Sequence, residues 1–277
     1  MRVGIGSWTF PWAIGVSGYP APKEPLDAIG LLQRAKDLGV SVVQIADNLP
    51  LHILNERQLE ALRKESLKRG ITLEVGTRGV EPAHLLIYLN IAKYLGAKIV
   101  RTLITTADSS PDLDQVEAYI REVVPQFAAN DVSIALENYE THKVRDLAAL
   151  VERIQSKHVG ICLDTVNSLA ALEVPQQVVG DLAPYVLSLH IKDFNIRRVR
   201  SMMGFSVMGC PAGDGRLDIG WIVAQLARHG KNPNMILELW TPFCETVEKT
   251  VTIEQEWACK SVRFLMKYEV ETQGVGP

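Results

Sequence analysis

Short hydrophobic runs alternate with longer amphipathic stretches along the whole chain. The short runs are rich in Val, Ile and Leu, as is typical of strands buried on both faces of a parallel sheet. Strands are predicted near Arg2–Ile5, Val42–Ile45, Thr72–Val75, Ile99–Leu103, Ser133–Leu136, Val159–Leu163, Val186–Leu189 and Met235–Leu239. The stretches between them repeat apolar residues at helical spacing. Helices are predicted over Leu26–Leu38, Asn55–Arg69, Pro82–Leu95, Asp112–Ala129, Lys143–Gln155, Gln176–Leu182, Ile219–His229 and Thr252–Tyr268.

This alternation predicts an α/β protein with a closed (β/α)8 TIM barrel. Strand and helix follow each other without a break, which favours a barrel over an open sheet. A dinucleotide-binding sheet is disfavoured because the stretch from Gly4 to Thr9 lacks the third glycine of a phosphate loop. The length of 277 residues suits a barrel, and no break in composition divides the chain. We therefore predict one domain over residues 1–277.

Charge and cysteine content narrow the class of protein further. The formal net charge of −3 gives no electrostatic reason to expect a nucleic acid or an anionic membrane as partner. No uninterrupted apolar stretch approaches the roughly 20 residues that span a bilayer. The N-terminus shows no secretory apolar run, and the four cysteines are scattered. These features predict a cytoplasmic enzyme without a nucleic-acid or membrane partner.

Two insertions interrupt the regular alternation. The segment Trp8–Glu24 follows the first predicted strand, and Asp193–Gly215 follows the seventh. Both leave the carboxyl ends of strands, where barrel enzymes place their active sites. We expect both to be functional loops.

Four consecutive predicted strands each end in a polar residue that can bind a metal ion. These residues are Glu137, Asp164, His190 and Glu238. Any one of these residues, taken singly, could instead be a polar residue at the end of a strand that forms a salt bridge. Taken together, converging carboxylates in an apolar barrel would repel one another unless a cation held them. We predict one divalent metal ion bound by all four, with Mn²⁺ favoured by this donor set and Mg²⁺, Co²⁺ and Zn²⁺ as alternatives.

The motifs around these residues resemble those of the xylose-isomerase-like TIM-barrel superfamily, which includes sugar isomerases, ketose 3-epimerases, inosose dehydratases and related lyases. The resemblance covers nearly the whole chain. It rests on Leu136-Glu137-Asn138, Leu163-Asp164-Thr165, His190-Ile191-Lys192-Asp193, the turn Gly213–Asp218, and Leu237-Glu238. It implies that the four polar residues bind one divalent metal and that, in the epimerases, the two glutamates move protons on opposite sides of a substrate carbon.

One position departs from the epimerase pattern. Many epimerases of this type carry Asp-x-x-His at the sixth strand, whereas this chain has Asn167 in place of the histidine. Asn167 can hydrogen bond to a substrate hydroxyl but carries no charge near neutral pH. This departure leaves the substrate and the reaction open.

The proposed metal and the paired glutamates suggest a reaction through an enediolate. A Lewis acid stabilises the charge that develops when a proton or a carboxylate leaves the carbon beside a carbonyl. We predict an isomerase or epimerase of a small keto-sugar or sugar acid, with Glu137 and Glu238 as acid–base residues. The alternative is a decarboxylase of a 3-oxo sugar acid, of the 3-oxo-isoapionate type, which belongs to the same superfamily and would use the same site.

Further residues are candidates for substrate binding. Asn167 and Lys192 lie close to the predicted ligands in the sequence, and Arg197 leads a group of basic residues after the seventh strand. A guanidinium there suits a substrate carboxylate or phosphate, although a solvated basic loop is the alternative. Trp8 follows the first strand and either lines the sugar pocket or caps the barrel. The expected partner is a small sugar or sugar acid, and a homo-oligomer is left open because relatives often form dimers or tetramers.

Overall fold

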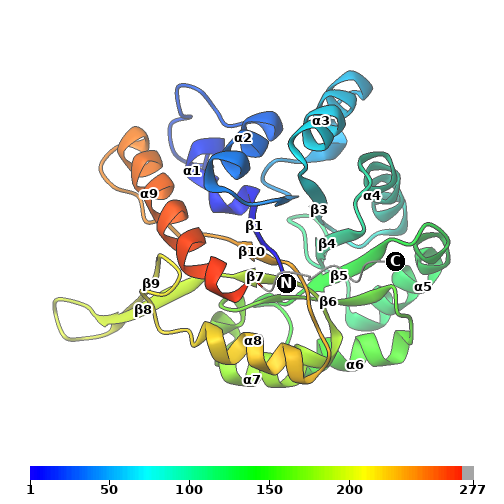
Figure 1. Cartoon of the computed structure of the whole chain (residues 1–277). Helices are drawn as coiled ribbons and strands as arrows, with labels where there is room; N and C mark the ends of the chain where they lie inside the picture. Colours follow the sequence, from blue (N-terminus) through cyan, green and yellow to red (C-terminus); the bar gives the residue numbers. More distant parts are fainter. Residues whose placement is uncertain (270–277) are drawn as a thin grey trace.

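The computed structural model describes residues 1–269 and contains a closed barrel of parallel strands (Figure 1). Around the barrel the strand order is β1-β10-β7-β6-β5-β4-β3-β2. The strands are β1 Val3–Gly6, β2 Val42–Ile45, β3 Thr72–Arg78, β4 Ile99–Leu103, β5 Ser133–Glu137, β6 Val159–Asp164, β7 Val186–Ile191 and β10 Met235–Leu237. The predicted (β/α)8 fold is confirmed. Residues 270–277 of the predicted single domain lie outside the described residues.

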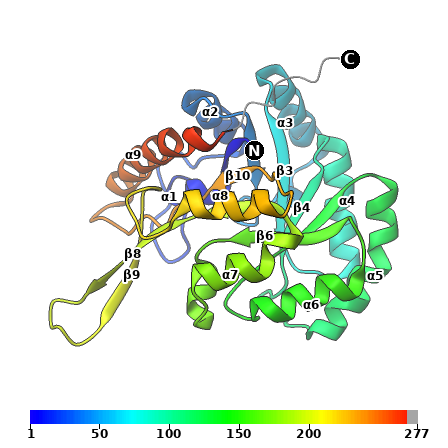
Figure 2. The same ribbon diagram turned by 60° about the horizontal axis from the view of Figure 1, so that its bottom comes forward.

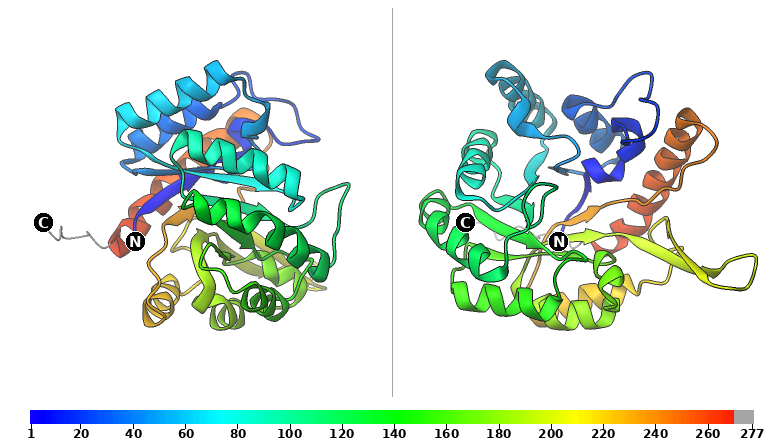
Figure 3. Two further views of the ribbon diagram at one scale, coloured as in Figure 1. Left: turned by 90° about the vertical axis from the view of Figure 1, so that its right-hand side faces the viewer. Right: turned by 180° about the vertical axis from the view of Figure 1, so that it is seen from behind.

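Helices surround the barrel on its outer side (Figures 1 and 3). They are α2 Ala28–Leu38, α3 Glu56–Arg69, α4 Pro82–Leu95, α5 Leu113–Ala129, α6 Val144–Ile154, α7 Pro175–Leu182, α8 Ile219–Arg228 and α9 Val247–Leu265. Helices α2, α3 and α4 each end at a glycine in the left-handed conformation, where only glycine avoids a steric penalty: Gly39, Gly70 and Gly96. Within residues 1–269 no helix has the length and apolar character needed to cross a membrane.

The segment after β7 is not the irregular loop that the sequence suggested. It forms an antiparallel hairpin of β8 Asp193–Arg198 and β9 Phe205–Cys210, which projects from the barrel (Figures 1 and 2). Several apolar side chains of the hairpin are exposed, including Met203 and Phe205. The first insertion contains a short helix, α1 Pro11–Ile14, and α9 begins earlier than predicted because Thr246 caps it.

The base of the hairpin is fixed by one carboxylate. Asp193 Oδ2 accepts hydrogen bonds from the backbone N–H groups of Gly213 at 2.9 Å and Gly215 at 3.0 Å. Its Oδ1 accepts from Phe194 at 2.8 Å and Leu217 at 3.2 Å. A Cβ on Gly215 would lie 1.9 Å from Asp193 Oδ1, so only glycine allows this close approach. The two ends of the insertion are therefore joined directly beside β7.

Candidate metal centre and its cavity

The four predicted metal ligands converge at the carboxyl ends of neighbouring strands. Asp164 and His190 are register partners at the ends of β6 and β7, Glu137 ends β5, and Glu238 follows β10. None of the four is more than 2% exposed. Parallel strands bring their last residues to one edge of the sheet, and barrel closure turns that edge into a ring. The structure thus brings all four side chains together.

The distances around His190 suit a shared cation. Its Nδ1 lies 3.2 Å from Glu238 Oε1, 3.4 Å from Glu137 Oε2 and 4.0 Å from Asp164 Oδ2. Both His190 Nδ1 and Glu238 Oε1 are buried and have no hydrogen-bond partner within residues 1–269. A protonated Nδ1 forms an ion pair with Glu238 Oε1 without a hydrogen bond, and a cation that replaces this proton would satisfy both buried atoms. Asp164, His190 and Glu238 offer ligand atoms that all lie within 4.8 Å of one another. These residues fit a divalent metal ion.

Cys162 offers a further ligand atom close to Glu137 and His190. Burial raises the pKa of this thiol to about 11, and the thiolate is the form that binds metals. Cys162 therefore favours the protonated state at neutral pH. The set of three carboxylates and one imidazole describes the site better than a thiolate set does.

Gln44 orients the imidazole from the opposite side of the ring. Gln44 Nε2 donates to Glu74 Oε2 at 3.0 Å, which turns its Oε1 toward His190 Nε2 at 2.8 Å. The Nε2 nitrogen therefore carries a hydrogen, and Nδ1 faces the carboxylates. Glu74 is itself held by Ser188 Oγ at 3.2 Å and Asn234 Nδ2 at 2.7 Å. Sequence reasoning missed Gln44, although a lone glutamine in the apolar strand β2 is a signal.

Nδ1 of His190 is a position for which a proton and a metal ion compete. Burial lowers the pKa of His190, but Cys162, Glu238 and Glu137 raise it, with the result well above the ordinary value. Metal binding at Nδ1 has to displace this proton, because a ligating imidazole nitrogen is unprotonated.

Lys192 lies among the predicted metal ligands. Its ammonium is 2.7 Å from Asp164 Oδ2, 2.8 Å from Glu238 Oε2 and 3.2 Å from Asn167 Oδ1. Burial lowers the pKa of Lys192, but Asp164 and Glu238 raise it above its usual range, so the ammonium stays charged. Glu238 therefore presents one oxygen to His190 and the other to Lys192.

A second buried cation, Arg101, lies on the other side of the site. Its Nε contacts Glu137, and its Nη1 donates to Asp47 Oδ1 at 2.9 Å. Burial raises the pKa of Glu137, but Arg101 lowers it, and the outcome is a pKa well below the usual range. Glu137 is therefore ionised at neutral pH. Sequence reasoning missed this role of Arg101, for which the only signal was one arginine inside the apolar strand β4.

A cavity of about 150 Å³ opens beside these groups and is lined by Glu137 and Glu238. Three of the residues predicted to bind substrate also line it, namely Trp8, Asn167 and Lys192. Trp8 Nε1 donates to Asp47 Oδ1 at 3.2 Å, and Asn167 Nδ2 donates to Glu137 Oε1 at 2.9 Å. These contacts fix both side chains at the wall of the cavity.

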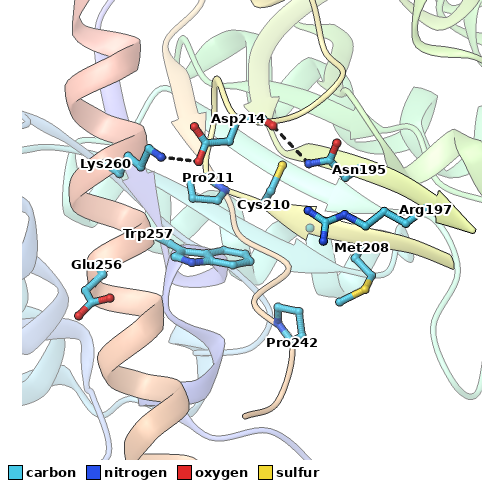
Figure 4. A pocket seen from close by; sticks show the side chains of 11 residues that line it. Asn195, Arg197, Met208, Cys210, Pro211, Asp214, Pro242, Glu256, Trp257 and Lys260 are labelled. Carbon is cyan, nitrogen blue, oxygen red and sulfur yellow. Dashed lines mark hydrogen bonds and ion pairs between the residues drawn. The ribbon is translucent and has the colours of Figure 1, made fainter. Parts of the chain in front are cut away.

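Arg197 lies elsewhere. It lines a separate groove of about 660 Å³ between the hairpin and α9, together with Cys210, Trp257 and Lys260 (Figure 4). The residues that line the smaller cavity instead include Arg78, at the end of β3. The structure therefore does not bring Arg197 together with the other candidate residues, and its contact with substrate stays a prediction.

Comparison with known proteins shows the family of this chain. The xylose isomerase-like TIM barrel family matches residues 32–267, and the chain belongs to that family. The resemblance predicted from the motifs is confirmed. The sequence is 36% identical over 265 residues to a 3-oxo-isoapionate decarboxylase of Pectobacterium atrosepticum, covering 96% of this chain and 95% of that protein.

Similar solved structures support the fold. A D-psicose 3-epimerase from Clostridium cellulolyticum H10, solved with D-tagatose, has a TM-score of 0.71 and 17% identity over 97% of this chain and 99% of its own. A xylose isomerase-like protein from Mycobacterium smegmatis, solved in complex with magnesium, has a TM-score of 0.69 and 16% identity over 94% and 96%. These two likenesses show the fold, and the 36% identity to the decarboxylase supports an enzyme of this family.

Proposed function

We propose that the chain is a divalent-metal-dependent enzyme that acts on a small keto-sugar or sugar acid through an enediolate. The observation that carries the proposal is the convergence of Glu137, Asp164, His190 and Glu238, with unpaired atoms facing one another beside a cavity. Mn²⁺ is the preferred ion, with Mg²⁺, Co²⁺ and Zn²⁺ as alternatives. When bound, the ion would supply Lewis-acid stabilisation of the charge that develops beside a substrate carbonyl.

The chain's own residues supply proton transfer and charge. Arg101 keeps Glu137 ionised, which is the state that a base requires before it accepts a proton. Glu238 is the second acid–base residue. Lys192 holds a positive charge next to Glu238, where it stabilises an anionic state of the substrate. Asn167 is placed to hydrogen bond to a substrate hydroxyl.

Two reactions suit this arrangement, and one observation now favours the second. In an isomerase or epimerase, a proton leaves one carbon and another returns to the substrate. In a decarboxylase of a 3-oxo acid, the C–C bond to the carboxylate breaks, carbon dioxide leaves, and the electron pair forms an enolate that takes a proton at carbon. The 36% identity to a 3-oxo-isoapionate decarboxylase spans nearly both chains, so we favour decarboxylation of a 3-oxo sugar acid.

The test compares carbon dioxide release with deuterium incorporation. Mn²⁺-loaded protein is incubated in D₂O with 3-oxo-isoapionate and, separately, with D-psicose. Decarboxylation releases carbon dioxide and leaves deuterium on the product carbon. Epimerisation yields a deuterated epimer without carbon dioxide. Failure of both reactions, with metal bound, would contradict the proposed enediolate chemistry.

Substitution of the glutamates tests their role. Glu137→Gln and Glu238→Gln are each expected to lower turnover by about 10²-fold or more, the usual contribution of a positioned acid or base. Glu122→Gln, on the exposed surface of α5, is the matched control. Near-normal turnover in both cavity variants would remove these glutamates from the chemistry.

A further inference from the structure

We propose that Arg78 binds a carboxylate of the substrate and that the cavity therefore selects sugar acids over neutral keto-sugars. This inference rests on the proposed function, because it places the substrate in the cavity beside the metal ligands. It concerns a residue that lies beyond the predicted end of its strand and to which the sequence assigned no role.

Three cations line the cavity, and two of them are committed to other groups. Arg101 contacts Glu137 and donates from Nη1 to Asp47 Oδ1 at 2.9 Å and to the carbonyl of Thr77 at 3.1 Å. Lys192 is held by the carboxylates described above. These cations have few donors left for a ligand.

Arg78 is less committed, because it pairs with Asp47 only at 3.5 Å and its Nε makes no hydrogen bond within residues 1–269. This Nε is buried and lies nearest Oδ2 of Asp47, whose Oδ1 already accepts from Arg101 and Trp8. A planar guanidinium presents the fork of N–H groups that matches a carboxylate.

The guanidinium is also held in place. It lies over the ring of Tyr139, with the central carbon 5.4 Å from the ring centroid, and this stacking restricts its orientation. The Arg78 side chain is 35% exposed, so it can be reached from the mouth of the cavity. A positioned cation with access to solvent is suited to meet an incoming anion.

The experiment measures binding of two probes that differ at one end. D-Threonate carries a carboxylate where D-threitol carries a hydroxymethyl group, and both are titrated calorimetrically into Mn²⁺-loaded protein. We expect wild type to prefer threonate by about tenfold or more, which equals about 1.4 kcal/mol. Arg78→Met should reduce this preference severalfold, leaving the part that is due to the metal ion, and should leave threitol affinity within about twofold of wild type. Arg78→Lys should retain more of the preference than Arg78→Met, since lysine keeps the charge but loses the fork.

Control variants make the outcome specific. Arg57→Met, on the exposed face of α3, should keep the full preference. A Mn²⁺ titration of Arg78→Met should match wild type, which shows that the variant is folded with an intact metal site. A preference that is undiminished in Arg78→Met, or that is absent in wild type, overturns the proposal. A preference lost in Arg197→Met but kept in Arg78→Met also overturns it and assigns the anion to the hairpin.

The same measurements separate this inference from the proposed function. If Mn²⁺ binding does not depend on Glu238, the metal assignment fails, whatever Arg78 does. If metal binding and carbon dioxide release are intact but Arg78→Met keeps the full preference for threonate, only the carboxylate contact is wrong.

Discussion

Gln44 decides which nitrogen of His190 can meet a metal ion. The amide is fixed at both ends, since it donates to Glu74 and faces Nε2 of the imidazole. This arrangement leaves Nδ1 toward Glu137, Asp164 and Glu238. Partners of a ligating histidine fix its ring orientation and its tautomer, so metal affinity depends on residues that never touch the ion.

Gln44→Met should therefore weaken metal binding while the four ligands remain. We expect Mn²⁺ affinity to fall by about 10–100-fold, the usual effect of removing such a partner. Fluorescence-detected or calorimetric Mn²⁺ titration measures the change, and circular dichroism checks the fold. Gln126→Met, on the exposed side of α5, is the matched control. An unchanged affinity would show that packing alone holds the ring.

The residues of the site differ in how visible they are in the sequence. Glu137, Asp164 and His190 each end a run of apolar residues, and a polar residue that ends a buried strand stands out. Arg101 and Gln44 lie inside strands, and their partners come from other strands, so no local pattern shows what they contact. The candidate ligands could be predicted, whereas the groups that hold and neutralise them required the tertiary structure.

At the scale of elements, the barrel was more predictable than its insertions. Strands such as β4 are buried and leave a clear hydrophobic signal, and the ranges of β4 and α4 match the prediction. The hairpin of β8 and β9 has no such signal because residues such as Met203 and Phe205 are exposed and its base is fixed by Asp193 through distant backbone groups. Burial produces the pattern that sequence reasoning uses, so an unburied hairpin escapes it.

The contact between α9 and α1 predicts a dependence of stability on pH. Glu254 of α9 is buried and accepts hydrogen bonds from the backbone N–H groups of Trp12 at 2.9 Å and Ala13 at 3.1 Å. Burial raises its pKa to about 8, from an ordinary value of 4.5, although these N–H groups oppose the shift. The folded state therefore binds this proton more tightly than the unfolded state.

The sign of the effect follows from linkage. Between about pH 4.5 and pH 8 the unfolded chain has lost the proton while the folded chain retains it, so stability falls as pH rises and levels off above pH 8. We expect a loss on the order of a few kcal/mol over this range. In Glu254→Gln this loss should be absent.

Urea unfolding at pH 5 and pH 8.5 measures the difference between the two proteins. Histidines whose pKa values are shifted, such as His84, add the same pH dependence of stability to wild type and variant, and this dependence cancels in the comparison. Glu256→Gln, exposed on the same helix, should behave as wild type. Equal pH slopes for wild type and Glu254→Gln would show that this carboxyl does not titrate as described.

For the whole molecule, the proposed ion would join half of the barrel. Its ligands come from β5, β6, β7 and the end of β10, which are neighbours in the closed sheet. Any species that binds only the folded state stabilises it, by about 2.7 kcal/mol when free ion is at 100 times its dissociation constant. Excess Mn²⁺ should therefore raise the thermal midpoint, a chelator should reverse the rise, and Glu238→Gln should show little of it.

A Lys192 variant tests whether the stabilisation by Mn²⁺ arises at this site. Without an ion, its ammonium compensates the buried carboxylates of Asp164 and Glu238. Removing one partner of a buried pair costs about 3–5 kcal/mol, so metal-free Lys192→Met should be clearly less stable than wild type. Mn²⁺ should restore more stability to this variant than it adds to wild type, because the ion replaces the lost charge and no longer competes with the ammonium. Thermal unfolding with and without Mn²⁺ measures the midpoint shift of each protein, and Lys157→Met, at an exposed position, is the control. Equal shifts in wild type and Lys192→Met would mean that the ion and the ammonium do not share these carboxylates.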